Sequence, residues 1–149
     1  MPLAKNYGVR LIYANWRDYP GSTPYNADEL EAFKSPDVEK QTAAMQAQGR
    51  QIAKFLEYLI GSHNIPPLVC KDGEKYGGIS ILAWSLGSII LLPFLGHAHL
   101  LEEPTRNVLE GYLRTVVLYG TIQDLRQFYA NLMPNPYRST TLCTWQIAA

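Results

Sequence analysis

The chain has 149 residues with 13 basic and 13 acidic side chains, so its formal net charge is zero. A neutral chain lacks the basic surface that nucleic acid or an anionic membrane would require of a partner. Apolar residues make up 47% of the chain and charged residues 17%, which fits a single globular domain over 1–149 with a sizeable core.

The two cysteines, Cys70 and Cys143, are too few and too far apart for a metal cluster or a disulfide framework. We therefore expect no metal and no cofactor. The N-terminal residues Met1–Asn6 contain no apolar core of signal-peptide length, so we expect a cytoplasmic protein.

The first predicted element is a short buried strand at Val9–Ala14, which is rich in strand-forming residues. A loop at Asn15–Tyr25 follows, in which Pro20 with Gly21 predicts a turn and Pro24 excludes regular structure. Taken alone, this loop is a polar turn after a strand.

Two helices are predicted next. Asn26–Glu29 has the form of a capping box, which predicts a helix through about Phe33. Ser35 followed by Pro36 predicts the start of a longer helix, whose apolar residues recur every three or four positions until Gly61 closes it. We interpret this apolar stripe as a packing surface and assign it no chemistry. The stripe consists of Met45, Gly49, Ile52, Phe55, Leu56, Leu59 and Ile60.

Two short segments lead to the centre of the chain. Leu68–Cys70 is either an apolar anchor or an edge strand, and 71–75 reads as a charged loop. The segment from Gly77 to about Leu95 then places one apolar run before Ser85 and a second one after it. β-Branched and aromatic residues precede the serine and leucines mostly follow it, which predicts a strand, a very tight turn and a helix.

The same segment has a second interpretation. Ile79–Leu101 contains no Asp, Glu, Lys or Arg and is long enough to cross a bilayer as one helix. The glycines inside this stretch, together with Pro93 and the change of composition at Ser85, favour the strand and helix over a membrane span.

A further helix is predicted from Glu103 to Leu113, and a second buried strand at Arg114–Gly120. The order of elements predicts an α/β fold with a parallel sheet of about three strands and helices on its faces. Ser85, the Asn15–Tyr25 loop and the segment after Tyr119 would then meet at the carboxyl edge of the sheet.

Beyond that strand, apolar spacing predicts a short amphipathic helix between Leu125 and Leu132. The remaining residues, 134–149, show no periodicity and are expected to be disordered.

The five residues centred on Ser85 resemble the nucleophile elbow of the α/β-hydrolase superfamily, G-x-S-x-G, with Ala83 in place of the first glycine and Gly87 as the second. The Asn15–Tyr25 loop is similar to the loop after the fourth strand of fungal members. The resemblance covers about 9–120 and implies a partial α/β-hydrolase fold containing the fourth, fifth and sixth strands.

The resemblance also implies roles for individual residues. Ser85 would be the nucleophile of a serine hydrolase of the esterase or lipase kind, forming an acyl intermediate with a small ester or lipid-like substrate. The backbone N–H of Leu86 would be one oxyanion donor. Trp84, with Arg17, Asp18 and Tyr25 from the loop, would belong to the pocket.

The family's catalytic acid and histidine follow the nucleophile in the chain, and here no histidine follows the last strand. His97 and His99 lie far along the helix after Ser85, and His63 precedes the elbow strand, so all three should lie out of reach of the serine. Asp124 lies at the correct edge but has no histidine to orient.

We therefore expect a fragment of a hydrolase that lacks the first three and the last strands and is inactive as this chain alone. The alternative hypothesis is a non-catalytic binding or oligomerising module on the same scaffold. Such a module would associate through its exposed sheet edges.

Overall fold

The computed structural model describes residues 2–120, and it divides the chain into two compact units, Met1–Gln41 and Thr42–Ala149. Four of the sequence predictions lie outside the described residues: Asp124, Cys143, the helix between Leu125 and Leu132, and the disorder over 134–149.

The first unit contains two short helices, α1 (Pro2–Asn6) and α2 (Ala27–Lys34), joined by a long irregular segment. The strand predicted at Val9–Ala14 is wrong: the segment has no regular structure, and Val9, Leu11, Ile12 and Tyr13 are all exposed. An apolar run becomes a strand only where a neighbouring strand accepts its backbone hydrogen bonds. Within the described residues no strand pairs with this run.

The predicted capping box of α2 is confirmed. The Asn26 side chain accepts from the Glu29 N–H at 2.8 Å, and the Glu29 carboxylate accepts from the Asn26 N–H at 2.9 Å. The next helix, α3 (Val38–Ser62), begins two residues later than predicted. Asp37 provides the capping oxygen to Glu39 at 2.9 Å, so Pro36 lies before the helix rather than in its first turn.

The segment predicted as a charged loop is a β-hairpin. Strands β1 (Val69–Lys71) and β2 (Glu74–Tyr76) pair antiparallel across Asp72 and Gly73. These two residues have φ of 54° and 80°, and positive φ at both positions is what a type I′ hairpin turn requires. The Asp-Gly pair was the sequence signal for this hairpin.

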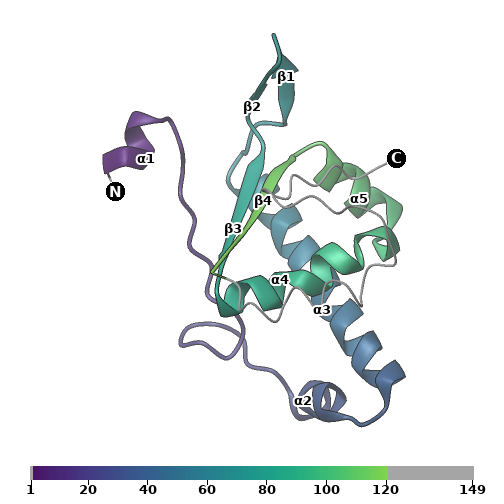
Figure 1. Cartoon of the computed structure of the whole chain (residues 1–149). Coiled ribbons are helices and arrows are strands. Elements are labelled where there is room, and N and C mark those ends of the chain that lie inside the picture. Colours follow the sequence, from purple (N-terminus) through teal and green to yellow (C-terminus); the bar gives the residue numbers. More distant parts are fainter. Residues whose placement is uncertain (1, 121–149) are drawn as a thin grey trace. The chain divides into compact units, whose positions relative to one another are not determined.

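Strand β3 (Ile79–Trp84) and helix α4 (Leu86–Gly96) meet at Ser85, so the predicted strand, turn and helix are confirmed (Figure 1). The uncharged stretch Ile79–Leu101 is therefore not one helix. It ends in a single 3₁₀ turn, η1 (Ala98–Leu100). Among the described residues, none of the helices has the length and apolar character needed to cross a membrane.

Helix α5 (Glu103–Glu110) ends three residues earlier than predicted, and strand β4 (Leu113–Tyr119) follows it. β3 and β4 are parallel neighbours, with Ile81 opposite Val116 and Trp84 opposite Tyr119. The α/β class predicted from the sequence is present, but the parallel sheet of the described residues has two strands rather than about three, because the segment at 9–14 forms none.

In the second unit the core lies between the helices and one face of the β3–β4 pair. Alternate residues of β3 are exposed, as expected for a strand covered on one face. The buried apolar side chains of this core are Ile52, Ala53, Leu56, Leu59, Ile60, Ala83, Leu91, Leu92, Phe94, Leu101, Leu109 and Val116.

Candidate active site

Ser85 has an unusual backbone conformation, with φ of 51° and ψ of −120°. A residue with a Cβ rarely adopts positive φ, and such strain persists only where the surrounding structure enforces it. Here the Ser85 N–H donates to the Tyr119 carbonyl of β4 at 2.8 Å, and the Ser85 carbonyl accepts from the Ser88 N–H at 2.9 Å. The strand on one side and the helix on the other thus hold the turn.

The side chain of Ser85 is exposed and makes no capping hydrogen bond to α4, although the residue occupies the N-cap position. It lies where the positive end of the helix dipole favours negative charge. Leu86 is the first residue of α4, so its N–H has no acceptor within the helix. A hydroxyl at the N-terminus of a helix, next to an N–H without a helical acceptor, suits the development of an oxyanion.

The small residues on either side of the serine have different roles. Ala83 is buried, and its carbonyl accepts a hydrogen bond from the Ser88 hydroxyl at 3.1 Å. Ser88 is fully buried, so this bond fastens the first turn of α4 to the end of β3. At Gly87, an added Cβ would meet only the Ala83 Cβ, at 4.0 Å, which is ordinary contact. Close packing therefore limits the size of the side chain more strongly at Ala83 than at Gly87.

Trp84, which the resemblance assigns to a pocket, is 73% exposed. It lies on the same face of the β3–β4 pair as Leu82 and Tyr119, which are 71% and 67% exposed. Gly120 has φ of 66°, and a Cβ there would lie 3.0 Å from the indole ring. Gly120, at which the chain leaves β4, therefore lies directly against Trp84.

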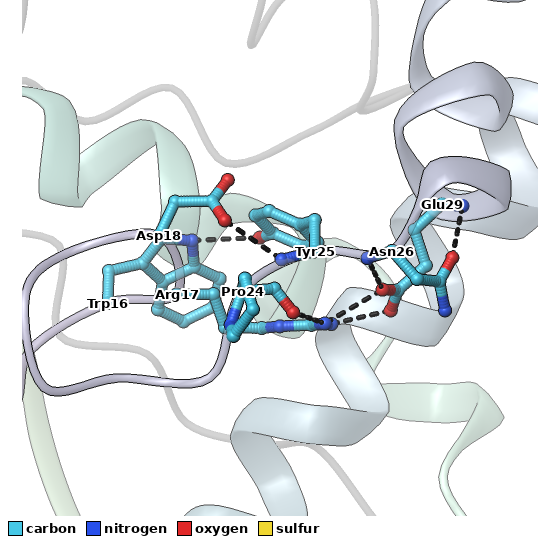
Figure 2. Close-up of polar contacts among 7 residues, drawn as sticks. All are labelled: Trp16, Arg17, Asp18, Pro24, Tyr25, Asn26 and Glu29. Atoms are coloured by element: carbon cyan, nitrogen blue, oxygen red, sulfur yellow. Dashed lines mark hydrogen bonds and ion pairs between the residues drawn. The ribbon is translucent and has the colours of Figure 1, made fainter.

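Arg17 is tied down by several contacts (Figure 2). Its two terminal nitrogens donate to the two carboxylate oxygens of Glu29, and one of them also donates to the Pro24 carbonyl at 2.7 Å. The guanidinium carbon lies 4.2 Å from the centre of the Tyr25 ring. The hydrogen bonds that Arg17 donates to Glu29 raise the pKa of Arg17 above its ordinary value, and burial acts in the opposite direction.

Asp18 and Tyr25 close the same loop. The Asp18 carboxylate accepts from the Tyr25 N–H at 2.8 Å, and the Tyr25 hydroxyl accepts from the Trp16 indole at 2.9 Å. Tyr25 also packs edge-on against Phe33 of α2, with 5.5 Å between ring centres. We call the set Trp16, Arg17, Asp18, Tyr25 and Glu29 the loop clasp.

The structure thus brings Arg17, Asp18 and Tyr25 together with one another in the first unit, while Ser85 and Trp84 belong to the second. The contacts of the loop clasp attach the loop at 16–25 to helix α2. The ion-pair partner of Arg17 is Glu29 of α2.

Glu29→Gln tests the clasp, because glutamine still completes the capping box but no longer forms the ion pair with Arg17. The Leu30 N–H donates to the Asn26 carbonyl at 3.1 Å and reports the opening of α2. We expect its protection against amide exchange to fall about fivefold, which corresponds to about 1 kcal/mol for one partly exposed, bidentate pair. Glu31→Gln removes the same charge from an exposed position of α2 and should leave the protection unchanged.

The histidines lie where the sequence predicts. His97 and His99 follow the last turn of α4, about 16 Å along the helix from Ser85. His63 follows α3 and leads to Pro66, whose carbonyl accepts from the Gly78 N–H at the start of β3. That is the end of the strand opposite Ser85, so none of the three can act as its base.

Two interactions that matter here were not identified from the sequence. Ser88 locks the elbow, and a small polar residue three positions after the turn was its signal. Glu29 was identified as a capping residue, but its pairing with Arg17, twelve positions earlier, has no local signal. Within residues 2–120 no group of three or more His, Cys, Asp or Glu side chains is arranged to hold a metal ion.

Models of protein families, curated proteins and solved structures were all compared with the chain, and none of them matches it.

Proposed function

We propose that Ser85 is the nucleophile of a serine hydrolase of the α/β-hydrolase kind. The observation that carries the proposal is the backbone of Ser85, at φ of 51° and ψ of −120° in a one-residue turn between a parallel strand and a helix. A catalytic serine needs this arrangement because the sharp turn exposes its hydroxyl beside the N–H groups of the helix. A purely structural turn at this point would be less strained with glycine.

In the proposed reaction the Ser85 hydroxyl attacks the carbonyl carbon of an ester, and the Leu86 N–H stabilises the oxyanion that forms. The alcohol leaves and an acyl-Ser85 ester remains, which water then hydrolyses. The reaction also needs a base that accepts the serine proton, and His63, His97 and His99 all lie out of reach of Ser85. Hydrolysis by the isolated chain should therefore be close to background, because losing the base of a triad costs several orders of magnitude in rate.

A thiol at position 85 tests the proposed activation without needing a base. We expect Ser85→Cys, with Cys70 and Cys143 both changed to serine, to have a thiol pKa about one unit or more below that of an ordinary cysteine, because the thiolate would face the N-terminus of α4. The rate of alkylation by iodoacetamide as a function of pH measures it. Ser80→Cys, also exposed on β3 but remote from a helix terminus, is the matched control. Equal pKa values at the two positions would remove the basis for activation at Ser85.

One observation favours the alternative, a module that binds a second copy of this chain. Leu82, Trp84 and Tyr119 are exposed on one face of the β3–β4 pair, and β3 carries no charged side chain. Natural edge strands usually carry charges that prevent pairing with another chain, as β1 and β2 do with Lys71, Glu74 and Lys75. This alternative predicts a concentration-dependent dimer in sedimentation, which Leu82→Lys would abolish. A monomer at all concentrations would contradict it.

A further inference from the structure

The N-terminal segment of the first unit differs in charge from the rest of the chain. Residues 2–16 contain two basic side chains, Lys5 and Arg10, and no Asp or Glu, although the whole chain is neutral. The first acidic residue is Asp18, and its carboxylate already accepts the Tyr25 N–H at 2.8 Å. The segment therefore carries a local positive charge that the overall composition conceals.

The same segment exposes a group of apolar side chains. Single exposed apolar residues are common on protein surfaces, but a contiguous group of them usually marks a place where something binds. Five such residues occur within seven positions, and they are Tyr7, Val9, Leu11, Ile12 and Tyr13.

A well-defined turn shapes this part of the chain. The Gly8 N–H donates to the Lys5 carbonyl at 3.1 Å, and the Val9 N–H donates to the Ala4 carbonyl at 2.8 Å. These two hydrogen bonds form a Schellman motif, which requires the left-handed conformation that Gly8 adopts at φ of 62°. The motif ends α1 and fixes the direction in which the chain leaves the helix (Figure 1).

An open hollow of about 570 Å³ lies between the last turn of α1 and the chain that follows it. We call it the N-terminal hollow. Its volume is in the range of about 300–1,000 Å³ that proteins use for small ligands. The helix contributes Ala4 and Lys5 to its lining, and the chain beyond Gly8 contributes Val9, Arg10, Leu11 and Tyr13.

The lining of the N-terminal hollow combines apolar surface with positive charge. Val9, Leu11 and Tyr13 offer the apolar surface. Lys5 and Arg10 offer charged donors, which form the stronger kind of hydrogen bond with a carboxylate or phosphate. Among the described residues, no acidic side chain lines the hollow, so a cation would find no partner there. The ligand that fits this lining has an anionic head and an apolar tail.

We propose that the N-terminal hollow binds a single-chain amphiphile with an anionic head, such as a fatty-acid carboxylate. Lys5 and Arg10 pair with the head, and the alkyl chain lies along Val9, Leu11 and Tyr13. The proposal does not depend on the role of Ser85, because every residue of the hollow belongs to the first unit.

A bilayer surface fits this site less well than a single amphiphile. Segments that bind a membrane surface present a continuous apolar face to it. Here three of the five exposed apolar side chains line a concavity, and only Tyr7 and Ile12 lie outside it. A concave site suits one alkyl chain.

Titration of the full chain with dodecanoate below its critical micelle concentration tests the site, with NMR amide shifts as the readout. We expect saturable one-to-one binding at neutral pH, with the largest shifts between Gly8 and Tyr13. Dodecyltrimethylammonium has the same alkyl chain and the opposite charge, and it should bind about tenfold more weakly because it cannot accept hydrogen bonds from the two cations. Octanoate should also bind about tenfold more weakly, because its shorter tail covers less apolar surface.

Two substitutions locate the head group. Lys5→Gln and Arg10→Gln should each weaken dodecanoate binding about tenfold, because each removes a charged donor. Both residues are exposed, so neither substitution disturbs a buried contact of the fold. Lys34→Gln is the matched control, because it removes the same charge from an exposed position of α2 outside the hollow, and it should leave the affinity unchanged.

Three results would overturn the proposal. The first is equal affinity for dodecanoate and dodecyltrimethylammonium. The second is unchanged dodecanoate binding in both Lys5→Gln and Arg10→Gln. The third is binding to phosphatidylserine vesicles without binding to monomeric dodecanoate, which would make the segment a membrane-surface contact instead of a ligand site.

Discussion

Replacing Gly49 with alanine should destabilise the chain by about 2 kcal/mol, although alanine favours helices by about 1 kcal/mol over glycine. The added Cβ would lie 2.7 Å from the Pro93 oxygen and 3.0 Å from the Pro93 carbonyl carbon, and backbone atoms cannot rotate away as a side chain can. The helices α3 and α4 must therefore separate, at the usual cost of overpacking a core.

Gly61→Ala is the matched control, because Gly61 is also in α3 but has nothing within 4 Å of an added Cβ. It should stabilise the chain by about 0.5–1 kcal/mol, so the two substitutions are predicted to have opposite signs. Urea unfolding measures both free energies. Stabilisation by Gly49→Ala would contradict the close crossing of α3 and α4.

Replacing Ser85 with glycine should stabilise the chain by about 1–2 kcal/mol. The serine is held at φ of 51° and ψ of −120°, a conformation that costs a residue with a Cβ about 1–3 kcal/mol. Glycine removes this cost but loses more conformational entropy on folding, which offsets part of the gain.

Ser80→Gly provides the comparison, since Ser80 is exposed in the regular part of β3. It should cost about 0.5–1 kcal/mol, because glycine weakens a strand whose backbone it does not relieve. If both substitutions destabilise the chain equally in urea unfolding, Ser85 is not strained and the argument for a nucleophile elbow fails.

The sequence predicted best where structure depends on local chemistry. The capping box at Asn26 and the change of element at Ser85 are both determined by neighbouring residues, and both are present. The strand predicted at Val9–Ala14 failed, because an apolar run does not reveal whether another strand is available to pair with it. The pairing of Arg17 with Glu29 depends on how a loop folds back on α2, which spacing alone does not encode.

The hairpin at Asp72 and Gly73 was missed in the sequence analysis for a different reason. Its two strands are short, exposed and partly charged, so they lack the alternating apolar pattern, and the turn dipeptide was the only signal. At the candidate site, the position of Ser85 could be predicted from its small neighbours. The lock that Ser88 forms with the Ala83 carbonyl could not, because it requires the register between strand and helix.

The measurement that tests the central claim most directly is fluorophosphonate labelling of the protein that the full-length transcript encodes. The transcript is first sequenced across both ends of this reading frame. The account predicts further coding sequence that supplies a histidine and an acid after β4, a single label on Ser85, and loss of that label in Ser85→Ala but not in Ser80→Ala. A transcript closed by stop codons at Met1 and Ala149, or a label that survives Ser85→Ala, would contradict it.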